Sequence, residues 1–248
     1  MNVYFISGLG ADRRAFQRIV LPPQYTIHHI DWVKPMKRET LNQYAQRLTQ
    51  FIDTTQPFAL VGLSFGGMIA TAMTAFVKPV KTILLSSIGC AGELPWYFRL
   101  AGSLRIHKLV PQVLYNRPTE LAHWLFGARS KTERKALSTI IADADPDFVR
   151  WAIGAILTWK NNRRPAHLFH IHGGRDKILP IHCTKPDVVI AKGSHFMVWT
   201  HASTISKMLE RALEESAHTP EGRAARHEPG SSWQRTVDRR VVVKTQRH

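Results

Sequence analysis

The hydrophobic pattern of the chain alternates between short apolar runs and longer segments with helical spacing. Between the runs, residues 41–52 carry apolar side chains three and four positions apart, which predicts a helix packed on a sheet. The alternation predicts an α/β fold, with a mostly parallel sheet of about six strands and helices on both faces. The runs with the length and composition of strands are residues 2–7, 25–32, 58–63, 81–87, 167–172 and 187–191.

A long stretch in the middle of the chain, residues 89–164, contains no strand pattern. We expect a helical cap insertion at residues 91–164, set into a core formed by residues 1–90 and 165–216. The apolar spacing inside this insertion predicts several helices, at residues 96–109, 119–126, 132–141 and 146–159.

The composition changes after residue 216. Pro, Gly, Ser, Arg and His dominate residues 217–248, and the apolar run at 241–243 is too short to build a core. Such a segment cannot bury enough apolar surface to offset the entropy lost on ordering. The sequence therefore predicts a basic, disordered C-terminal extension.

Ser64 lies where a predicted strand ends and a predicted helix begins, in the sequence Gly62-Leu63-Ser64-Phe65-Gly66-Gly67. Glycines on both sides of the serine permit a tight, strained corner that holds the hydroxyl outward. The following helix directs its first N–H groups and its positive dipole end toward the place where an oxyanion would form. This combination is typical of the nucleophile elbow, G-x-S-x-G.

A nucleophilic serine needs a general base, and the base needs an acid that orients it. Asp176 follows the run 167–172 among glycines and a proline, at the end of a strand where α/β sheets present catalytic groups. His195 follows the next apolar run and a glycine. The order Ser64, Asp176, His195 is the order expected of one fold in particular.

With these motifs the chain resembles the α/β-hydrolase fold superfamily, in particular its small bacterial members with a short N-terminus. The resemblance rests on Ser7-Gly8-Leu9-Gly10, the elbow, His172-Gly173 through Pro180, and Gly193-Ser194-His195-Phe196. It implies an α/β-hydrolase fold that lacks the first strands, and an acyl-enzyme mechanism. The backbone N–H groups of Leu9 and Phe65 are then the expected oxyanion donors. One departure is Ser7, where superfamily members commonly have histidine.

Other residues compete for the catalytic roles. His201 falls inside the expected C-terminal helix, which favours a surface position over that of a base. Asp187 opens a strand at the end away from the active edge, and Asp143 lies in the insertion. Ser86 and Ser87 end a strand without an elbow, which favours hydrogen bonding over nucleophilic attack.

The insertion is rich in aromatic residues, which suits an apolar acyl pocket over Ser64. For any single tryptophan, packing of the insertion onto the sheet is the better explanation, so these residues are assigned to the pocket only as a group. The candidate substrate-binding residues are Trp96, Trp124, Trp151 and Trp159.

The formal net charge of +16 is high for an enzyme that acts on small molecules. Residues 217–248 contribute seven Lys or Arg and three Asp or Glu, a net +4, and the remainder is spread along the chain. A basic surface favours anionic partners. No basic motif interleaved with aromatic residues is present, so the sequence does not favour a nucleic-acid partner. No oligomeric state is defined by the sequence.

Targeting signals and cysteine usage indicate a compartment. Residues 1–6 run directly into an apolar strand without a basic leader, and no apolar run reaches membrane-spanning length. Cys90 and Cys183 are the only cysteines, which does not suggest a disulfide framework. We therefore expect a cytoplasmic protein without a membrane span.

Histidine is frequent, with 13 residues, which raises the question of a metal. His170 and His172 are two apart and share one face of a strand, and His182 follows. No zinc-binding spacing is present. The sequence predicts neither a metal nor a cofactor.

Together these features predict a serine hydrolase, similar to carboxylesterases and thioesterases, that cleaves an ester or thioester of a small, largely apolar acyl substrate. The alternative is a receptor-like protein that retains the triad and holds a small ligand with little turnover.

Overall fold

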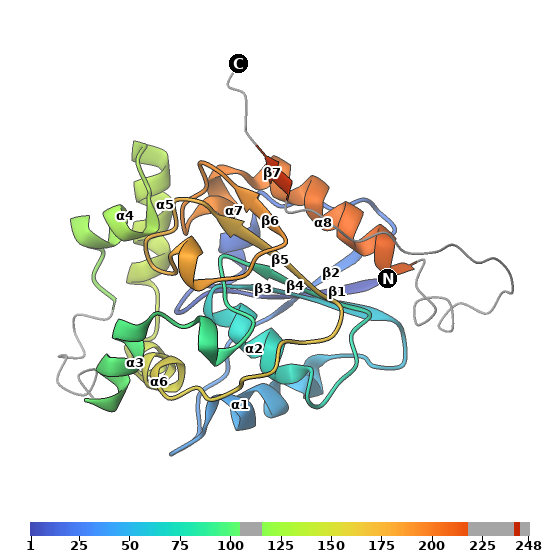
Figure 1. Cartoon of the computed structure of the whole chain (residues 1–248), viewed down its shortest axis with the longest axis horizontal. Coiled ribbons are helices and arrows are strands. Elements are labelled where there is room, and N and C mark those ends of the chain that lie inside the picture. The colour runs from blue at the N-terminus through green and yellow to red at the C-terminus, as the bar shows by residue number, and fades with distance from the viewer. Residues whose placement is uncertain (105–115, 218–240, 244–248) are drawn as a thin grey trace, which may run out of the picture.

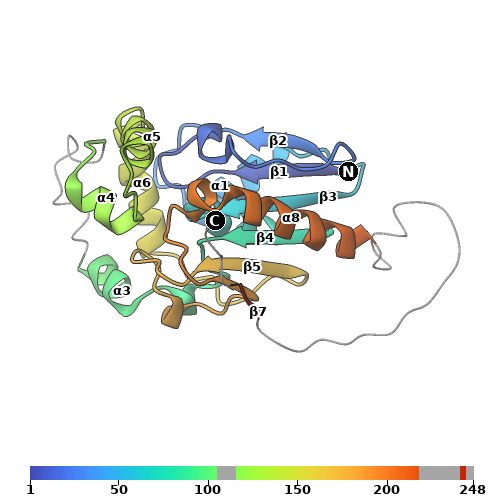
Figure 2. The ribbon, with the colours of Figure 1, turned by 90° about the horizontal axis from the view of Figure 1, so that it is seen from above.

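The computed structural model of the chain describes residues 1–104, 116–217 and 241–243. One parallel sheet forms the centre (Figures 1 and 2). Its strand order is β2-β1-β3-β4-β5-β6-β7, and every neighbouring pair is parallel. The strands are β1 (Asn2–Ile6), β2 (Thr26–Ile30), β3 (Phe58–Leu63), β4 (Lys81–Leu85), β5 (Leu168–Gly173), β6 (Val188–Ile190) and β7 (Val241–Val243).

Helices cover both faces of this sheet (Figure 1). One face packs against α1 (Leu41–Leu48) and α2 (Phe65–Met73), and the other packs against α7 (Met197–Thr200) and α8 (Ala202–Ala217). This arrangement confirms the α/β class predicted from the alternation of strand and helix patterns.

The position of β3 inside the sheet explains why its sequence is apolar throughout. Phe58 and Leu60 belong to the apolar cluster on the α1 and α2 side, while Ala59 and Val61 belong to the cluster on the α8 side. All six residues of β3 are buried. A strand covered on both faces reads as a continuous hydrophobic run rather than an alternating one.

The segment between β4 and β5 contains helices and no strand in its described part. Figure 2 shows these helices gathered beyond the carboxyl ends of the strands. A capping box formed by Ser130 and Glu133 starts the helix Lys131–Ala142. Asp145 caps the helix Pro146–Leu157, which has Pro146 in its first turn. Part of the first predicted helix, residues 105–109, lies outside the described residues. The four helices are α3 (Trp96–Ser103), α4 (Glu120–Phe126), α5 (Lys131–Ala142) and α6 (Pro146–Leu157).

The C-terminal region differs from its prediction at three residues. Val241–Val243 form β7, which pairs with the edge strand β6. β-branched valines have high strand propensity, and the outer edge of β6 offers unpaired backbone groups. The expectation of a disordered extension is therefore wrong for these three residues. The remainder of 218–248 lies outside the described part of the chain.

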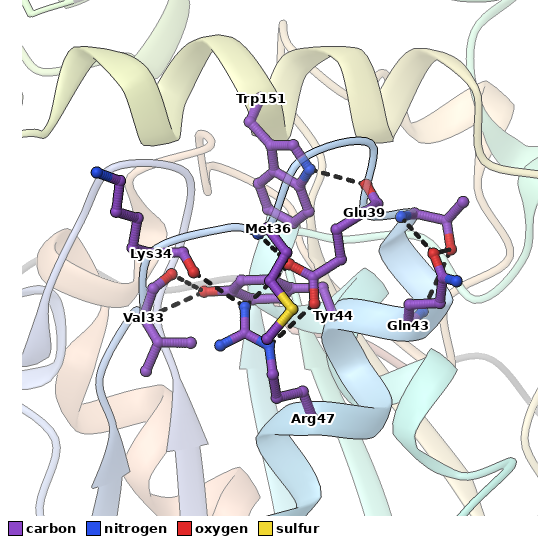
Figure 3. Close-up of polar contacts among 9 residues, drawn as sticks. Val33, Lys34, Met36, Glu39, Gln43, Tyr44, Arg47 and Trp151 are labelled. Atoms are coloured by element: carbon purple, nitrogen blue, oxygen red, sulfur yellow. Dashed lines mark hydrogen bonds and ion pairs between the residues drawn. The ribbon is translucent and has the colours of Figure 1, made fainter.

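A hydrogen-bonded cluster ties α6 to the loop after β2 (Figure 3). The Tyr44 hydroxyl donates to the Val33 carbonyl at 2.8 Å and accepts from the Val33 N–H at 3.0 Å. Arg47 donates to both carboxylate oxygens of Glu39 at 2.9 Å. The Trp151 indole N–H of α6 donates to the Glu39 carbonyl at 2.9 Å. The loop that Arg47 holds is thus one support of the helical insertion.

We expect this cluster to make stability depend on pH. Burial alone would raise the pKa of Glu39, but hydrogen bonds from Arg47 and the Met36 N–H, together with the charge of Arg47, hold it below its ordinary value. A carboxyl with a lowered folded-state pKa stabilises the fold above its unfolded pKa, and this contribution is lost as the pH falls through the folded-state value. At neutral pH the free energy of unfolding of Glu39→Gln should therefore be about 1–3 kcal/mol lower than that of the wild type.

The measurement is urea unfolding of wild type and Glu39→Gln at neutral pH and at progressively acidic pH, where the difference should shrink. The exposed Glu214→Gln serves as the control. A difference that stays constant at all pH values would contradict this role for the Glu39 carboxylate.

Candidate active site

The turn between β3 and α2 holds Ser64 in a strained backbone conformation, with φ 51° and ψ −118°. A Cβ atom at Gly62 would collide with the backbone of Gly67, and one at Gly66 would collide with the carbonyls of Ile6 and Ser7. Only glycine fits at both positions, so the two glycines are required by close backbone approach. The predicted elbow geometry is present around Ser64.

Three side chains distant in sequence form one hydrogen-bonded chain at this turn. His195 Nε2 lies 2.9 Å from the Ser64 hydroxyl, and His195 Nδ1 lies 2.7 Å from Asp176 Oδ2. Because a carboxylate accepts, His195 Nδ1 carries the hydrogen and Nε2 is free to accept from Ser64. His195 and Asp176 are buried, and Ser64 is partly exposed. The geometry fits proton transfer from the serine to the imidazole.

The Asp176 carboxylate is stabilised in its ionised form. Burial alone would raise the pKa of Asp176, but the charge of His195 and its hydrogen bond, with His172 and the Leu179 backbone, bring it below the ordinary value. Asp176 Oδ1 also accepts from the N–H groups of Ile178 and Leu179, both at 2.9 Å. One oxygen is therefore bound by the backbone, and the other is left to orient His195.

The helical insertion contacts the His195 loop directly. The Phe196 N–H donates to the Phe126 carbonyl at 3.0 Å, and the Phe126 ring lies edge-on to the His195 imidazole with 5.3 Å between centroids. The Lys177 ammonium lies 3.7 Å from the centre of the Trp124 ring. These contacts join α4 to the two loops that carry Asp176 and His195.

The loop after β1 approaches Ser64 from the neighbouring strand. The Trp32 indole donates to the Ala11 carbonyl at 2.8 Å, and the Ala11 N–H donates to the Gly8 carbonyl at 3.0 Å, so the loop is fixed. Among the described residues, the N–H groups of Leu9 and Phe65 have no hydrogen-bond acceptor, and both residues line the cavity at Ser64. The two residues expected from the sequence to supply oxyanion donors therefore border the cavity, and their role stays a prediction.

A cavity of about 450 Å³ opens at Ser64 and His195. The described residues around it contribute almost only aliphatic and aromatic side chains, and none carries a carboxylate, ammonium or guanidinium group. Its far walls come from the insertion, in particular from Leu137, Ile140, Ile141, Ile153, Ile156 and Leu157 of α5 and α6. Such a lining favours an apolar ligand group.

None of the four predicted tryptophans lines this cavity. Trp96 and Trp124 are 66% and 58% exposed, respectively. Trp151 packs 4.4 Å from the Tyr44 ring, and Trp159 is buried in the cluster beside α2. The expectation that tryptophans form the pocket differs from the structure, in which aliphatic residues three and four positions apart on α5 and α6 form the wall.

The competing residues lie elsewhere. His201 Nδ1 bonds the Thr200 hydroxyl at 2.8 Å, the Asp187 carboxylate accepts from the His170 backbone N–H at 2.7 Å, and Asp143 pairs with Arg14 at 2.7 Å. Ser87 donates its hydroxyl to the Ser64 carbonyl at 2.6 Å. The predicted hydrogen-bonding role is therefore confirmed for Ser87. It is wrong for Ser86, because its buried hydroxyl has no partner among the described residues.

Residues 1–104, 116–217 and 241–243 contain no group of three or more His, Cys, Asp or Glu side chains arranged to hold a metal ion. Within the same ranges, no helix is both long and apolar enough to span a bilayer.

Comparison with known proteins agrees with this architecture. No curated protein sequence matches the chain. Among solved structures it is similar to an esterase from Thermogutta terrifontis, with 17% identity, 88% of this chain and 91% of that chain covered, and a TM-score of 0.64. It is also similar to a bromoperoxidase from Bacillus anthracis, with 17% identity, 86% of this chain and 91% of that chain covered, and a TM-score of 0.60. A third similar structure is a lipase-esterase related protein from Clostridium acetobutylicum ATCC 824, with 15% identity, 85% of this chain and 93% of that chain covered, and a TM-score of 0.63.

At these identities the solved structures show a shared fold. A sequence model of the alpha/beta hydrolase family matches residues 3–235, which is most of the chain. The protein therefore belongs to the alpha/beta hydrolase family.

Proposed function

We propose that the protein is a serine hydrolase that cleaves a carboxylic ester or thioester of a largely apolar acyl group. The observation that carries the proposal is the chain Ser64–His195–Asp176, with contacts of 2.9 Å and 2.7 Å, at the mouth of an apolar cavity. Helices α3–α6 are proposed to act as a cap over a core of residues 1–90 and 165–216. The free thiols of Cys90 and Cys183 suit a reducing compartment, and we place the enzyme in the cytoplasm.

In the proposed reaction, the Ser64 hydroxyl attacks the acyl carbon while His195 Nε2 takes its proton. The N–H groups of Leu9 and Phe65 bind the negative oxygen of the tetrahedral intermediate. His195 then returns the proton to the leaving alcohol or thiol, and an acyl-Ser64 ester remains. Water attacks this ester with His195 again as base, which releases the acid and restores Ser64.

The cavity predicts how activity varies with acyl length. Each methylene group buried in it should contribute about 0.8 kcal/mol, or up to about fourfold in kcat/KM, until the space is full. A series of p-nitrophenyl esters and matching acyl thioesters should therefore show kcat/KM rising with chain length to a maximum. Hydrolysis that is absent with every member of both series would contradict the proposed function.

A substitution in the cavity wall tests the location of the acyl group. Ile140 of α5 is 6% exposed and lines the cavity. Ile140→Trp should move the optimum of kcat/KM to shorter acyl chains and lower the activity on the longest ester by about tenfold or more, because overpacking removes room for the chain. Thr139→Trp, at an exposed position next to it on α5, is the matched control. An unchanged chain-length profile in Ile140→Trp would contradict acyl binding in this cavity.

A further inference from the structure

A second histidine lies beside the Asp176 carboxylate. His172 Nε2 is 3.6 Å from Asp176 Oδ2, the same oxygen that accepts from His195, and the side chains of His172 and Asp176 have no exposed area. That distance is too long for a hydrogen bond. His172 Nε2 instead bonds the Leu179 carbonyl at 2.8 Å. The two contacts place His172 between the acid and the turn that follows it.

Hydrogen bonds assign the hydrogens of this buried pair. A carbonyl oxygen only accepts, so His172 Nε2 carries a hydrogen and donates it to Leu179. In its neutral form His172 then has a bare Nδ1, which accepts from His170 Nε2 at 3.0 Å. His170 Nδ1 forms no hydrogen bond within the part of the chain that the structure describes. Burial lowers the pKa of both histidines, that of His170 well below its ordinary value, which favours the neutral forms.

The charged groups around the pair support this assignment. His172 faces Asp176, which favours a charged imidazole, and His195, which opposes one. His170 faces His172 and Arg164, which both oppose protonation, and the Lys185 and Ser87 backbone, which favours it. The Asp187 carboxylate is engaged by the backbone N–H of His170. Desolvation is the largest influence on both rings, which favours neutral imidazoles with directed N–H groups.

We propose that His172 is a positioning residue that fixes the Asp176 carboxylate for its partner His195. Its Nε2–H bond holds the Leu179 carbonyl, while the N–H groups of Ile178 and Leu179 in the same turn bind Asp176 Oδ1. His172 Nε2, which carries this hydrogen, also lies 3.6 Å from Asp176 Oδ2. His170 sets the tautomer of His172 through Nδ1. This inference rests on the proposed function for its kinetic consequence only.

Two amide substitutions test the roles of the two ring nitrogens of His172 separately. His172→Gln can place an N–H donor near the position of Nε2, and His172→Asn can replace only the Nδ1 contact with His170. We expect His172→Gln to retain kcat within about threefold, whereas His172→Asn should lower kcat by about 10- to 100-fold with little change in KM, because small misplacements of a catalytic group are costly. His123→Phe, which removes another buried histidine, in the insertion, is the control for loss of stability.

The second readout does not require turnover. The low-field proton NMR signal of the His195 Nδ1–H that bonds Asp176 should persist in His172→Gln and shift or disappear in His172→Asn. Circular dichroism and thermal midpoints identify variants that are folded. Equal kcat and equal low-field signals in the two amide variants would overturn the proposal, and so would loss of kcat in both with the signal unchanged. If the protein proved to hydrolyse no ester, the NMR comparison would still decide the role of His172.

Discussion

Ser64→Ala is expected to lower kcat for a good ester substrate by about 10⁴- to 10⁶-fold while the fold remains intact. The hydroxyl is the group that would form the acyl-enzyme, and the alanine retains the Cβ that the elbow already accommodates. His195→Ala should lower kcat by a similar factor. Among the described residues, only His195 Nε2, 2.9 Å from the Ser64 hydroxyl, is positioned to accept its proton. Initial rates on the ester of optimal chain length measure both effects.

The double variant Ser64→Ala/His195→Ala distinguishes a cooperating pair from two independent groups. Residues that act as one catalytic unit are strongly non-additive, so the double variant should be no slower than the slower single variant. Ser203→Ala, on the exposed surface of α8, should retain wild-type rates. Ester hydrolysis at the wild-type rate in folded Ser64→Ala would contradict the proposed mechanism.

Asp176→Asn is expected to lower kcat by about 10⁴-fold, through the tautomer of His195. Oδ1 of Asp176 accepts two backbone N–H groups, from Ile178 and Leu179, each at 2.9 Å. An asparagine would keep its carbonyl oxygen at those donors and turn its NH₂ group toward His195 Nδ1. Nδ1 would then have to accept, which moves the imidazole hydrogen to Nε2 and blocks proton transfer from Ser64.

The matched control for this prediction is Asp143→Asn, the rival acid in the insertion, which pairs with Arg14 at the surface. Surface ion pairs contribute little, so its kcat should stay within about twofold of the wild type. Kinetics with folded variants, checked by circular dichroism, measure the comparison. A kcat for Asp176→Asn within tenfold of the wild type would show that the carboxylate does not set the His195 tautomer.

The core of the fold was predictable because its signals are local. A buried strand such as β3 reads as an apolar run, and α1 reads as an amphipathic segment. Ser64, Asp176 and His195 were each identified from short motifs at strand ends, and parallel strands bring their carboxyl ends to one edge. The structure joins them in one hydrogen-bonded chain. Their catalytic role stays a prediction.

The lining of the cavity was not predictable from residue type. Periodicity identified α5 and α6 but did not show which of their apolar side chains face Ser64 and which face the sheet. Trp151 illustrates this, because a long-range bond to the Glu39 carbonyl directs it away from the cavity. Tertiary contacts such as this one decide orientation, and they leave no trace in the spacing of a single helix.

The hydrogen positions of His170 and His172 on β5 were also not predictable from the sequence. The sequence placed His170 and His172 on one face of a strand, which is where they lie. Their hydrogen assignments depend on the Leu179 carbonyl, seven residues after His172, and on burial beneath the Asp176 turn. A pattern of residue types contains neither piece of information.

The most direct test of the central claim is labelling of the wild type and Ser64→Ala with a fluorophosphonate probe, followed by mass spectrometry of the modified peptide. Such a probe reacts with a serine whose hydroxyl is activated by a neighbouring base. The account predicts rapid labelling of the wild type at Ser64 and none in the folded Ser64→Ala variant. A well-folded wild type that resists the probe, or a label carried by another serine, would contradict an activated Ser64 and would favour a receptor-like protein that binds its ligand with little turnover.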